Sequence, residues 1–151
     1  MRKILIGLAL SLAFGGTALA ADYIVVNSTD PGIKRGQAFD AGARVQLGAG
    51  QTITLMRASG EVTTLRGAAA GVVVPGAKLA AADSARFETL RALVQPPPQG
   101  RTFGARRGGI CPALEALTTL DDIVQVAETS GCKSVARQAL EVYLTKSGGA
   151  S

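Results

Sequence analysis

The chain has 151 residues, a formal charge of +5 at pH 7 and no histidine. The lack of an imidazole excludes Ser-His-Asp hydrolases, Cys-His proteases and HExxH metalloproteases, because each of these mechanisms requires one. Four Phe, two Tyr and no Trp leave few rings for a stacking platform, which disfavours a nucleic-acid or sugar partner.

The first twenty residues have the pattern of a secretory signal peptide. Arg2 and Lys3 precede an apolar run over residues 4–14, and a small-x-small cleavage site ends at Ala20, so that Ala21 would be the first mature residue. The apolar run is much shorter than the roughly twenty residues that a membrane-spanning helix needs. We therefore expect an exported, non-integral protein in an oxidising compartment, most simply a bacterial periplasm.

Export would also change the charge of the protein. The formal charge would fall from +5 to +3, because two of the sixteen cations, Arg2 and Lys3, would leave with the leader. A mildly basic chain of this kind is expected to stay soluble and to be weakly attracted to anionic surfaces. Export itself disfavours nucleic acid as a partner.

Residues 21–78 show the pattern of a small β domain. Short apolar or alternating runs are separated by clusters of turn-forming residues, Gly, Pro and Asn among them. Five or six strands of this length predict a small sandwich or a barrel-like sheet. The runs occupy residues 23–26, 44–47, 51–56, 61–65 and 72–74.

The run over residues 51–56 alternates between apolar and polar side chains. The alternation places Thr52 and Thr54 on one face of a strand, opposite the apolar residues. A Ser-Gly pair at 59–60 predicts a two-residue hairpin turn, and Thr64 lies on the returning strand. We treat the exposed strand faces that carry these three threonines as candidate binding surfaces.

Residues 79–95 change to a helical pattern. Apolar side chains recur at helical spacing between residues 87 and 94, and Asp83 is placed as the N-cap. Three consecutive prolines at 96–98 end the helix, because proline cannot continue it. Residues 96–110 are rich in Pro, Gly and Arg, which predicts a mobile linker.

Residues 111–146 predict two helices that form a hairpin, with a break at the Ser-Gly pair 130–131. Thr119 and Asp122 have the spacing of a capping box at the start of the first helix. The last residues, 147–151, are expected to form a disordered tail. The pattern leaves open whether these helices pack against the β region.

Cys111 and Cys132 are the only cysteines, and in an exported chain such a pair favours a structural disulfide. Closing a loop of about twenty residues would stabilise the fold by roughly 3 kcal/mol in the chain-entropy treatment. A thioredoxin-type redox pair would have its cysteines two residues apart, and a zinc site would lack histidine ligands. We therefore expect no metal and no cofactor.

One catalytic pattern occurs by spacing. Residues 130–133 match the S-x-x-K pattern of penicillin-binding proteins and β-lactamases, in which a helical turn brings Lys133 beside Ser130, and Lys-Ser-Gly at 146–148 resembles their K-T-G triad. No Ser-Asp-Asn motif lies between the two, and the chain is too short for that fold. A small envelope enzyme that uses this Ser-Lys pair is the alternative function.

Arg101, Arg106 and Arg107 cluster in the linker. Guanidinium groups bind carboxylates and phosphates through paired hydrogen bonds. The cluster is therefore a candidate contact for a protein partner in the envelope, or for an anionic membrane surface.

The segments at 42–48 (GARVQLG) and 59–67 (SGEVTTLRG) resemble the β-repeat region of FecR-type periplasmic domains, in which a Gly-bounded strand is followed by a hairpin. The resemblance covers residues 22–75. FecR-type proteins are membrane-anchored regulators that relay a periplasmic signal to a sigma factor. The resemblance implies a periplasmic sensing or assembly module without the relay, and it carries over no catalytic residue.

Together these patterns predict an α+β protein, with a small N-terminal sandwich or barrel-like domain followed by a disulfide-linked helical hairpin. The predicted function is that of an exported, non-enzymatic protein of the periplasm that binds an envelope protein. The candidate contacts are the threonine-bearing strand faces and the arginine-rich linker.

Overall fold

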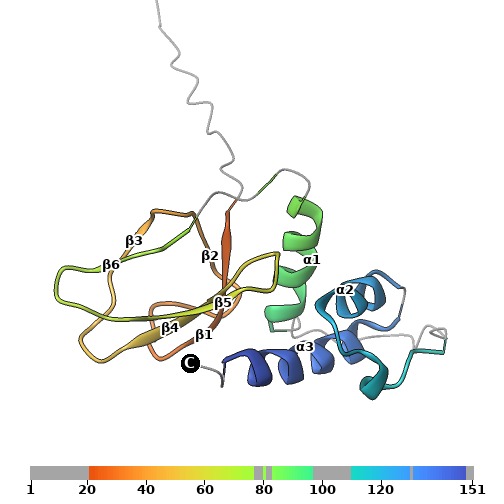
Figure 1. Cartoon of the computed structure of the whole chain (residues 1–151). Helices are drawn as coiled ribbons and strands as arrows, with labels where there is room; N and C mark the ends of the chain where they lie inside the picture. Colours follow the sequence, from red (N-terminus) through yellow and green to blue (C-terminus); the bar gives the residue numbers. More distant parts are fainter. Residues whose placement is uncertain (1–20, 77–79, 81–82, 97–109, 130, 149–151) are drawn as a thin grey trace, which may run out of the picture.

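The structure is a computed structural model, and it describes residues 21–76, 80, 83–96, 110–129 and 131–148. Strands come first along the chain and helices follow, so the protein has the expected α+β architecture (Figure 1). The proposed leader up to Ala20, most of the predicted linker and the last three residues lie outside the described residues.

Six strands form two antiparallel sheets. The larger sheet has the strand order β2-β1-β4-β5 and the smaller one pairs β3 with β6. The strands are β1 (Tyr23–Ser28), β2 (Ala38–Phe39), β3 (Arg44–Val45), β4 (Thr52–Met56), β5 (Val62–Arg66) and β6 (Val72–Val73).

The two sheets share an apolar core, so the β region is an open sandwich and not a closed barrel. Alternate residues of β1 and β4 face this core, because side chains alternate between the two faces of a strand. The buried residues of the core are Tyr23, Val25, Val45, Leu47, Ile53, Leu55 and Val74.

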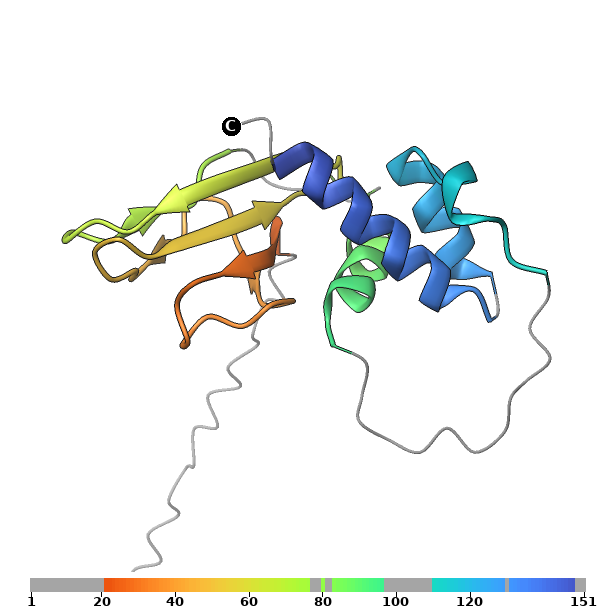
Figure 2. The same ribbon diagram turned by 90° about the horizontal axis from the view of Figure 1, so that it is seen from below.

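The opposite face of the larger sheet packs against the helices. These are α1 (Ser84–Val94), the short 3-10 turn η2 (Leu114–Ala116), α2 (Leu120–Glu128) and α3 (Lys133–Gly148). The buried members of this second core include Ile24, Val26 and Met56 from the sheet and Phe87, Leu90, Ile123, Ala136 and Leu140 from the helices. Figure 2 shows the C-terminal end of α3 beside the larger sheet, with α1 and α2 beside its N-terminal half.

Strand β1 connects the β region to the helices through its buried side chains. Tyr23, Ile24, Val25 and Val26 are all buried, because odd positions face the sandwich core and even positions face the helices. The question left open by the sequence is thereby answered, since the larger sheet and the helices share the second of the two cores.

A close approach joins α3 to the β4–β5 turn. The Tyr143 hydroxyl donates a hydrogen bond to the Gly60 carbonyl at 3.4 Å. Gly60 has a φ of +90°, and a Cβ at this position would lie 2.8 Å from the Tyr143 oxygen. Only glycine fits both the backbone conformation and the contact.

The disulfide and the capping box of α2 form between the residues that the sequence predicts. Cys111 and Cys132 form a disulfide that spans 21 residues. The Thr119 side chain accepts a hydrogen bond from the Asp122 amide while the Asp122 carboxylate accepts one from the Thr119 amide, which completes the predicted capping box.

Several boundaries differ from the sequence prediction. The β4–β5 loop has three residues, 58–60, because the Arg57 amide bonds to the Glu61 carbonyl and the Gly60 amide to the Arg57 carbonyl. This is the arrangement in which a left-handed glycine closes a three-residue hairpin. Helix α1 begins at Ser84, so Asp83 occupies the predicted N-cap position within the segment 79–95, but its side chain makes no capping hydrogen bond.

The C-terminal elements also differ in detail. Residues 114–116 form a separate 3-10 turn, and the first full helix of the hairpin begins only at Leu120. Helix α3 continues to Gly148, so Ser147 and Gly148 belong to the helix and not to a disordered tail.

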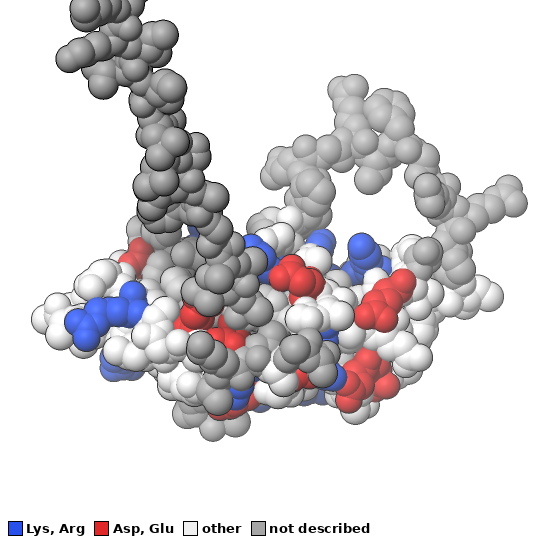
Figure 3. All heavy atoms as spheres, turned by 90° about the horizontal axis from the view of Figure 1, so that it is seen from above, with Lys and Arg blue, Asp and Glu red and all other residues white. Residues whose placement is uncertain are grey.

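The charge of the described body is nearly balanced. All eleven Asp and Glu lie among the described residues, together with ten of the sixteen Lys and Arg. Figure 3 shows acidic and basic side chains interspersed on the face viewed, without a broad field of one sign. Within the described ranges, no helix is both long and apolar enough to cross a bilayer.

Candidate functional site

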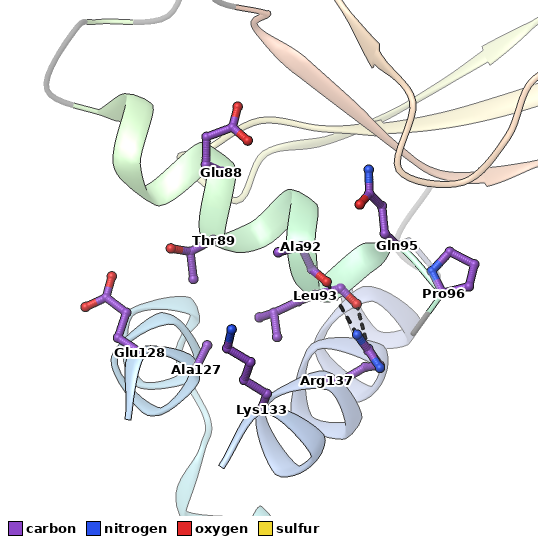
Figure 4. Close-up of a pocket in the computed structure, with 10 residues that line it drawn as sticks. All are labelled: Glu88, Thr89, Ala92, Leu93, Gln95, Pro96, Ala127, Glu128, Lys133 and Arg137. Atoms are coloured by element: carbon purple, nitrogen blue, oxygen red, sulfur yellow. Dashed lines mark hydrogen bonds between the residues drawn. The ribbon is translucent and has the colours of Figure 1, made fainter. Parts of the chain in front are cut away.

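A hollow between the helices, which we call the helical cleft, is the largest of the three hollows described below. Its volume is about 650 Å³, which is within the range of ligand and peptide sites. Figure 4 shows that α1 forms one wall and that α2 and α3 form the other. The lining residues are Glu88, Thr89, Ala92, Leu93, Gln95, Pro96, Ala127, Glu128, Lys133 and Arg137.

Apolar side chains form the floor of the helical cleft, and charges stand around it. Leu93 and Ala127 are buried at the floor, and Ala92 is exposed on the α1 wall. The Lys133 side chain points into the cleft between Leu93 and Ala127, while the exposed Glu128 stands on the α2 side (Figure 4). An apolar floor inside a charged rim is the usual layout of a recognition surface.

Arg137 fixes the relative positions of the two walls. Its Nε donates to the Leu93 carbonyl at 2.9 Å, and its Nη2 donates to the Ala92 carbonyl at 3.4 Å (Figure 4). These carbonyls belong to the last turn of α1, where helix carbonyls lack intrahelical partners and the dipole favours a cation. The Arg137 side chain therefore holds the C-terminal end of α1 against α3.

A second hollow, which we call the threonine groove, lies between the larger sheet and the C-terminal half of α3. Its volume is about 390 Å³. Thr54 and Thr64 stand opposite each other on β4 and β5, and their hydroxyl oxygens lie 3.3 Å apart. An ion pair between Arg35 and Glu141 also lines this groove.

A third hollow, of about 330 Å³, lies on the other side of α3. Leu114, Leu117 and Tyr143 contribute its apolar surface, together with Val142, which is 43 % exposed. It is smaller than the helical cleft and has fewer charged side chains around it.

The structure places two of the three predicted strand-face threonines in the same groove. Thr54 and Thr64 line the threonine groove, with Thr54 half-buried and Thr64 exposed. Thr52 lies apart from the groove, where its amide donates to the Thr29 hydroxyl at 2.8 Å and closes the end of the sheet. The predicted arginine cluster, Arg101, Arg106 and Arg107, lies outside the described residues.

The alternative catalytic pair is only half described. Ser130 lies outside the described residues, whereas Lys133 is the first residue of α3 and lines the helical cleft. The sequence analysis named Lys133 only as the partner of Ser130. It did not identify Leu93, Ala127 or Arg137 as site residues, because the packing of α1 on α3 joins positions far apart in the chain.

Among the described residues, no three His, Cys, Asp or Glu side chains gather closely enough to hold a metal ion. Burial raises the pKa of Tyr23, and hydrogen bonds from Thr119 lower the pKa of Asp122. Both groups lie outside the helical cleft, where they serve the core and the α2 cap.

Comparison with protein-family models, with curated proteins and with solved structures finds no match to this chain.

Proposed function

We propose that this protein is an exported, non-enzymatic module of the bacterial cell envelope that binds a segment of a partner protein in the helical cleft. The observation that carries the proposal is the cleft itself, which combines a volume of about 650 Å³ with a buried apolar floor and charges of both signs. Such a surface suits a polypeptide that inserts an apolar side chain and pairs its flanking charges.

The location in the periplasm rests on two independent features. The first is the signal-peptide pattern of residues 1–20, with Arg2 and Lys3 before an apolar run and a small-x-small site that ends at Ala20. The second is the Cys111–Cys132 disulfide, because such bonds persist in oxidising compartments and are rare in the cytosol.

The resemblance of residues 22–75 to FecR-type domains supports a sensing or assembly role. In that role the partner would be an envelope protein, and binding would be coupled to a signal or to an assembly step. The absence of histidine from the whole sequence supports a non-enzymatic function.

The test fills the helical cleft and leaves the rest of the surface unchanged. Ala92 is exposed on the α1 wall, so Ala92→Trp places an indole over the apolar floor without disturbing the core. Ala69→Trp is the matched control, because Ala69 is an equally exposed alanine between β5 and β6, away from the cleft. Tagged forms of both variants and of the wild type would be cross-linked in intact cells, and the adducts identified by mass spectrometry.

We expect wild type and Ala69→Trp to give the same dominant protein adduct, and Ala92→Trp to give at most a tenth of it. Equal adducts from all three forms would reject the helical cleft as the binding site. Circular dichroism and thermal unfolding of the purified variants would establish that each is folded.

Each of the two alternative functions is tested by a separate experiment. Labelling of Ser130 by a fluorophosphonate or β-lactam probe would favour the small envelope enzyme. Salt-sensitive binding to anionic vesicles, lost on changing Arg101, Arg106 and Arg107 to Ala, would favour the membrane-surface binder.

A further inference from the structure

Strand β5 forms an open edge of the larger sheet. Within the described part of the chain it pairs only with β4, in the sheet order β2-β1-β4-β5, and Figure 2 shows it as the outermost strand. The hydrogen bonds that flank the β4–β5 ladder tell which groups of β5 face outward. Gly67 donates to the Gln51 carbonyl at 2.7 Å and Arg57 donates to the Glu61 carbonyl at 3.0 Å.

These two bonds fix the alternation of the antiparallel ladder. Hydrogen-bonded pairs recur at every second residue, so Thr63 and Leu65 of β5 bond to β4. The amide and carbonyl groups of Val62, Thr64 and Arg66 therefore point away from β4. Among the described residues, these outward groups have no main-chain partner.

The β5 edge lacks the features that usually prevent strand addition. Proteins protect open edges with proline, bulges or charges within the strand. The Val-Thr-Thr-Leu stretch at 62–65 contains none of these, and the nearest charges, Glu61 and Arg66, stand at its two ends. An unprotected row of three alternating donor and acceptor pairs is suited to another strand.

We propose that β5 pairs with β5 of a second copy of this chain, antiparallel and about a two-fold axis at Thr64. In this register Thr64 faces Thr64 of the other copy, and Val62 faces Arg66 in both directions. All outward groups then form hydrogen bonds, and the two sheets become one. Because the two-fold axis is perpendicular to the sheet, the helices of both copies lie on the same face.

The side chains favour this register. Thr64 already contacts Thr54 through hydroxyl oxygens 3.3 Å apart, and the second copy would extend this pair into a row of four threonines. Threonine pairs across strands are favourable, and opposed like charges are not. Arg66 would lie opposite an apolar Val62, so the two arginines would stand at opposite ends of the paired segment.

The contact is small. Five residues on each side bury less than the 1,200–2,000 Å² that stable interfaces typically bury, so the association is weak and depends on concentration. The near balance of acidic and basic residues in the described body does not oppose it. The β5 edge is separate from the helical cleft. The test of this pairing therefore does not depend on whether the cleft binds a partner.

Cysteine cross-linking tests the register directly. In a hydrogen-bonded antiparallel pair the Cα atoms lie about 5.5 Å apart, so Thr64→Cys in the full exported chain places two thiols within reach of a short methanethiosulfonate cross-linker. Arg66→Cys is the control on the same strand, because its two copies would be separated by about four residues, or roughly 14 Å, along the strands. Both native cysteines are already paired and do not react.

We expect Thr64→Cys to give a covalent dimer on a non-reducing gel and Arg66→Cys to give at most a tenth as much. No dimer from Thr64→Cys, or equal amounts from both variants, would overturn the proposal. Sedimentation equilibrium provides a second test, in which the mean mass of the wild type rises with concentration. Thr64→Pro removes the outward amide and should stay monomeric, whereas Thr64→Ser should behave as wild type.

Discussion

At the scale of single residues, contacts between side chains and backbone groups hold the walls of the helical cleft. Arg137 binds the last carbonyls of α1, and Thr119 and Asp122 close the first turn of α2. The Thr119–Asp122 pair could be predicted, because a capping box is a local pattern of spacing. The role of Arg137 could not, because its acceptors lie more than forty residues earlier in the chain.

Replacing Arg137 should weaken the attachment of α1. We expect Arg137→Met to lower the free energy of unfolding by about 1.5 kcal/mol, because a hydrogen bond from a charged group is lost while the aliphatic part of the side chain is kept. Urea unfolding measures the change. Gln138→Met is the control, since Gln138 is the exposed neighbour and should show little effect. Equal losses in both variants would show that the Arg137 contacts do not stabilise the fold.

The capping box should make stability depend on pH at the acid end. Hydrogen bonds from Thr119 lower the pKa of Asp122 below its ordinary value of 3.8. Its stabilising contribution is therefore complete above pH 3.8 and disappears as the pH falls through the lower folded-state pKa. Urea unfolding should show Asp122→Asn to be less stable than wild type at pH 7, with the difference shrinking towards pH 2. A constant difference would contradict this assignment.

At the scale of elements, helix α2 depends on a covalent link. The disulfide joins Cys111, before η2, to Cys132, at the start of α3, and so encloses α2 in a loop. Sequence reasoning found the pair, the break between α2 and α3 and most strands. It placed both N-caps, Asp83 and Thr119, correctly. It made the β4–β5 turn one residue too short and missed the separate 3-10 turn at 114–116, because hydrogen bonding decides where such elements end and apolar spacing does not.

Removal of the disulfide should loosen α2 before the sheet. We expect the Cys111→Ser, Cys132→Ser double variant to lose roughly 3 kcal/mol of unfolding free energy, the value for a loop of about twenty residues. Hydrogen exchange should show faster exchange for the α2 amides than for β1 and β4. Unchanged stability would mean that α2 is held by its buried side chains alone.

At the scale of the whole molecule, one sheet separates two cores. The side chains of β1 pack alternately against the smaller sheet and against the helices. The unbroken apolar run Tyr23–Val26 is typical of a strand that is buried on both faces. The helices that cover it could not be identified from the sequence, since contacts such as the Arg35–Glu141 ion pair join residues more than a hundred positions apart.

The shared core predicts that the β region cannot fold alone. In a fragment of residues 21–76, Ile24, Val26 and Met56 would be exposed to water, whereas the complete chain buries all three. We expect the fragment to give the narrow amide dispersion of an unfolded chain in its NMR spectrum. We expect the complete protein to unfold in a single transition when followed both by far-UV circular dichroism and by tyrosine fluorescence. Independent folding of the fragment would contradict this account.

The central claim is that the helical cleft receives a partner protein, and site-specific photo-cross-linking in living cells tests it most directly. A photoreactive amino acid at Ala92 lies on the wall of the cleft, and one at Ala69 lies on the β5–β6 connection. The account predicts one dominant adduct from position 92 and none of that adduct from position 69. The same adduct from both positions, or no adduct from position 92, would contradict it.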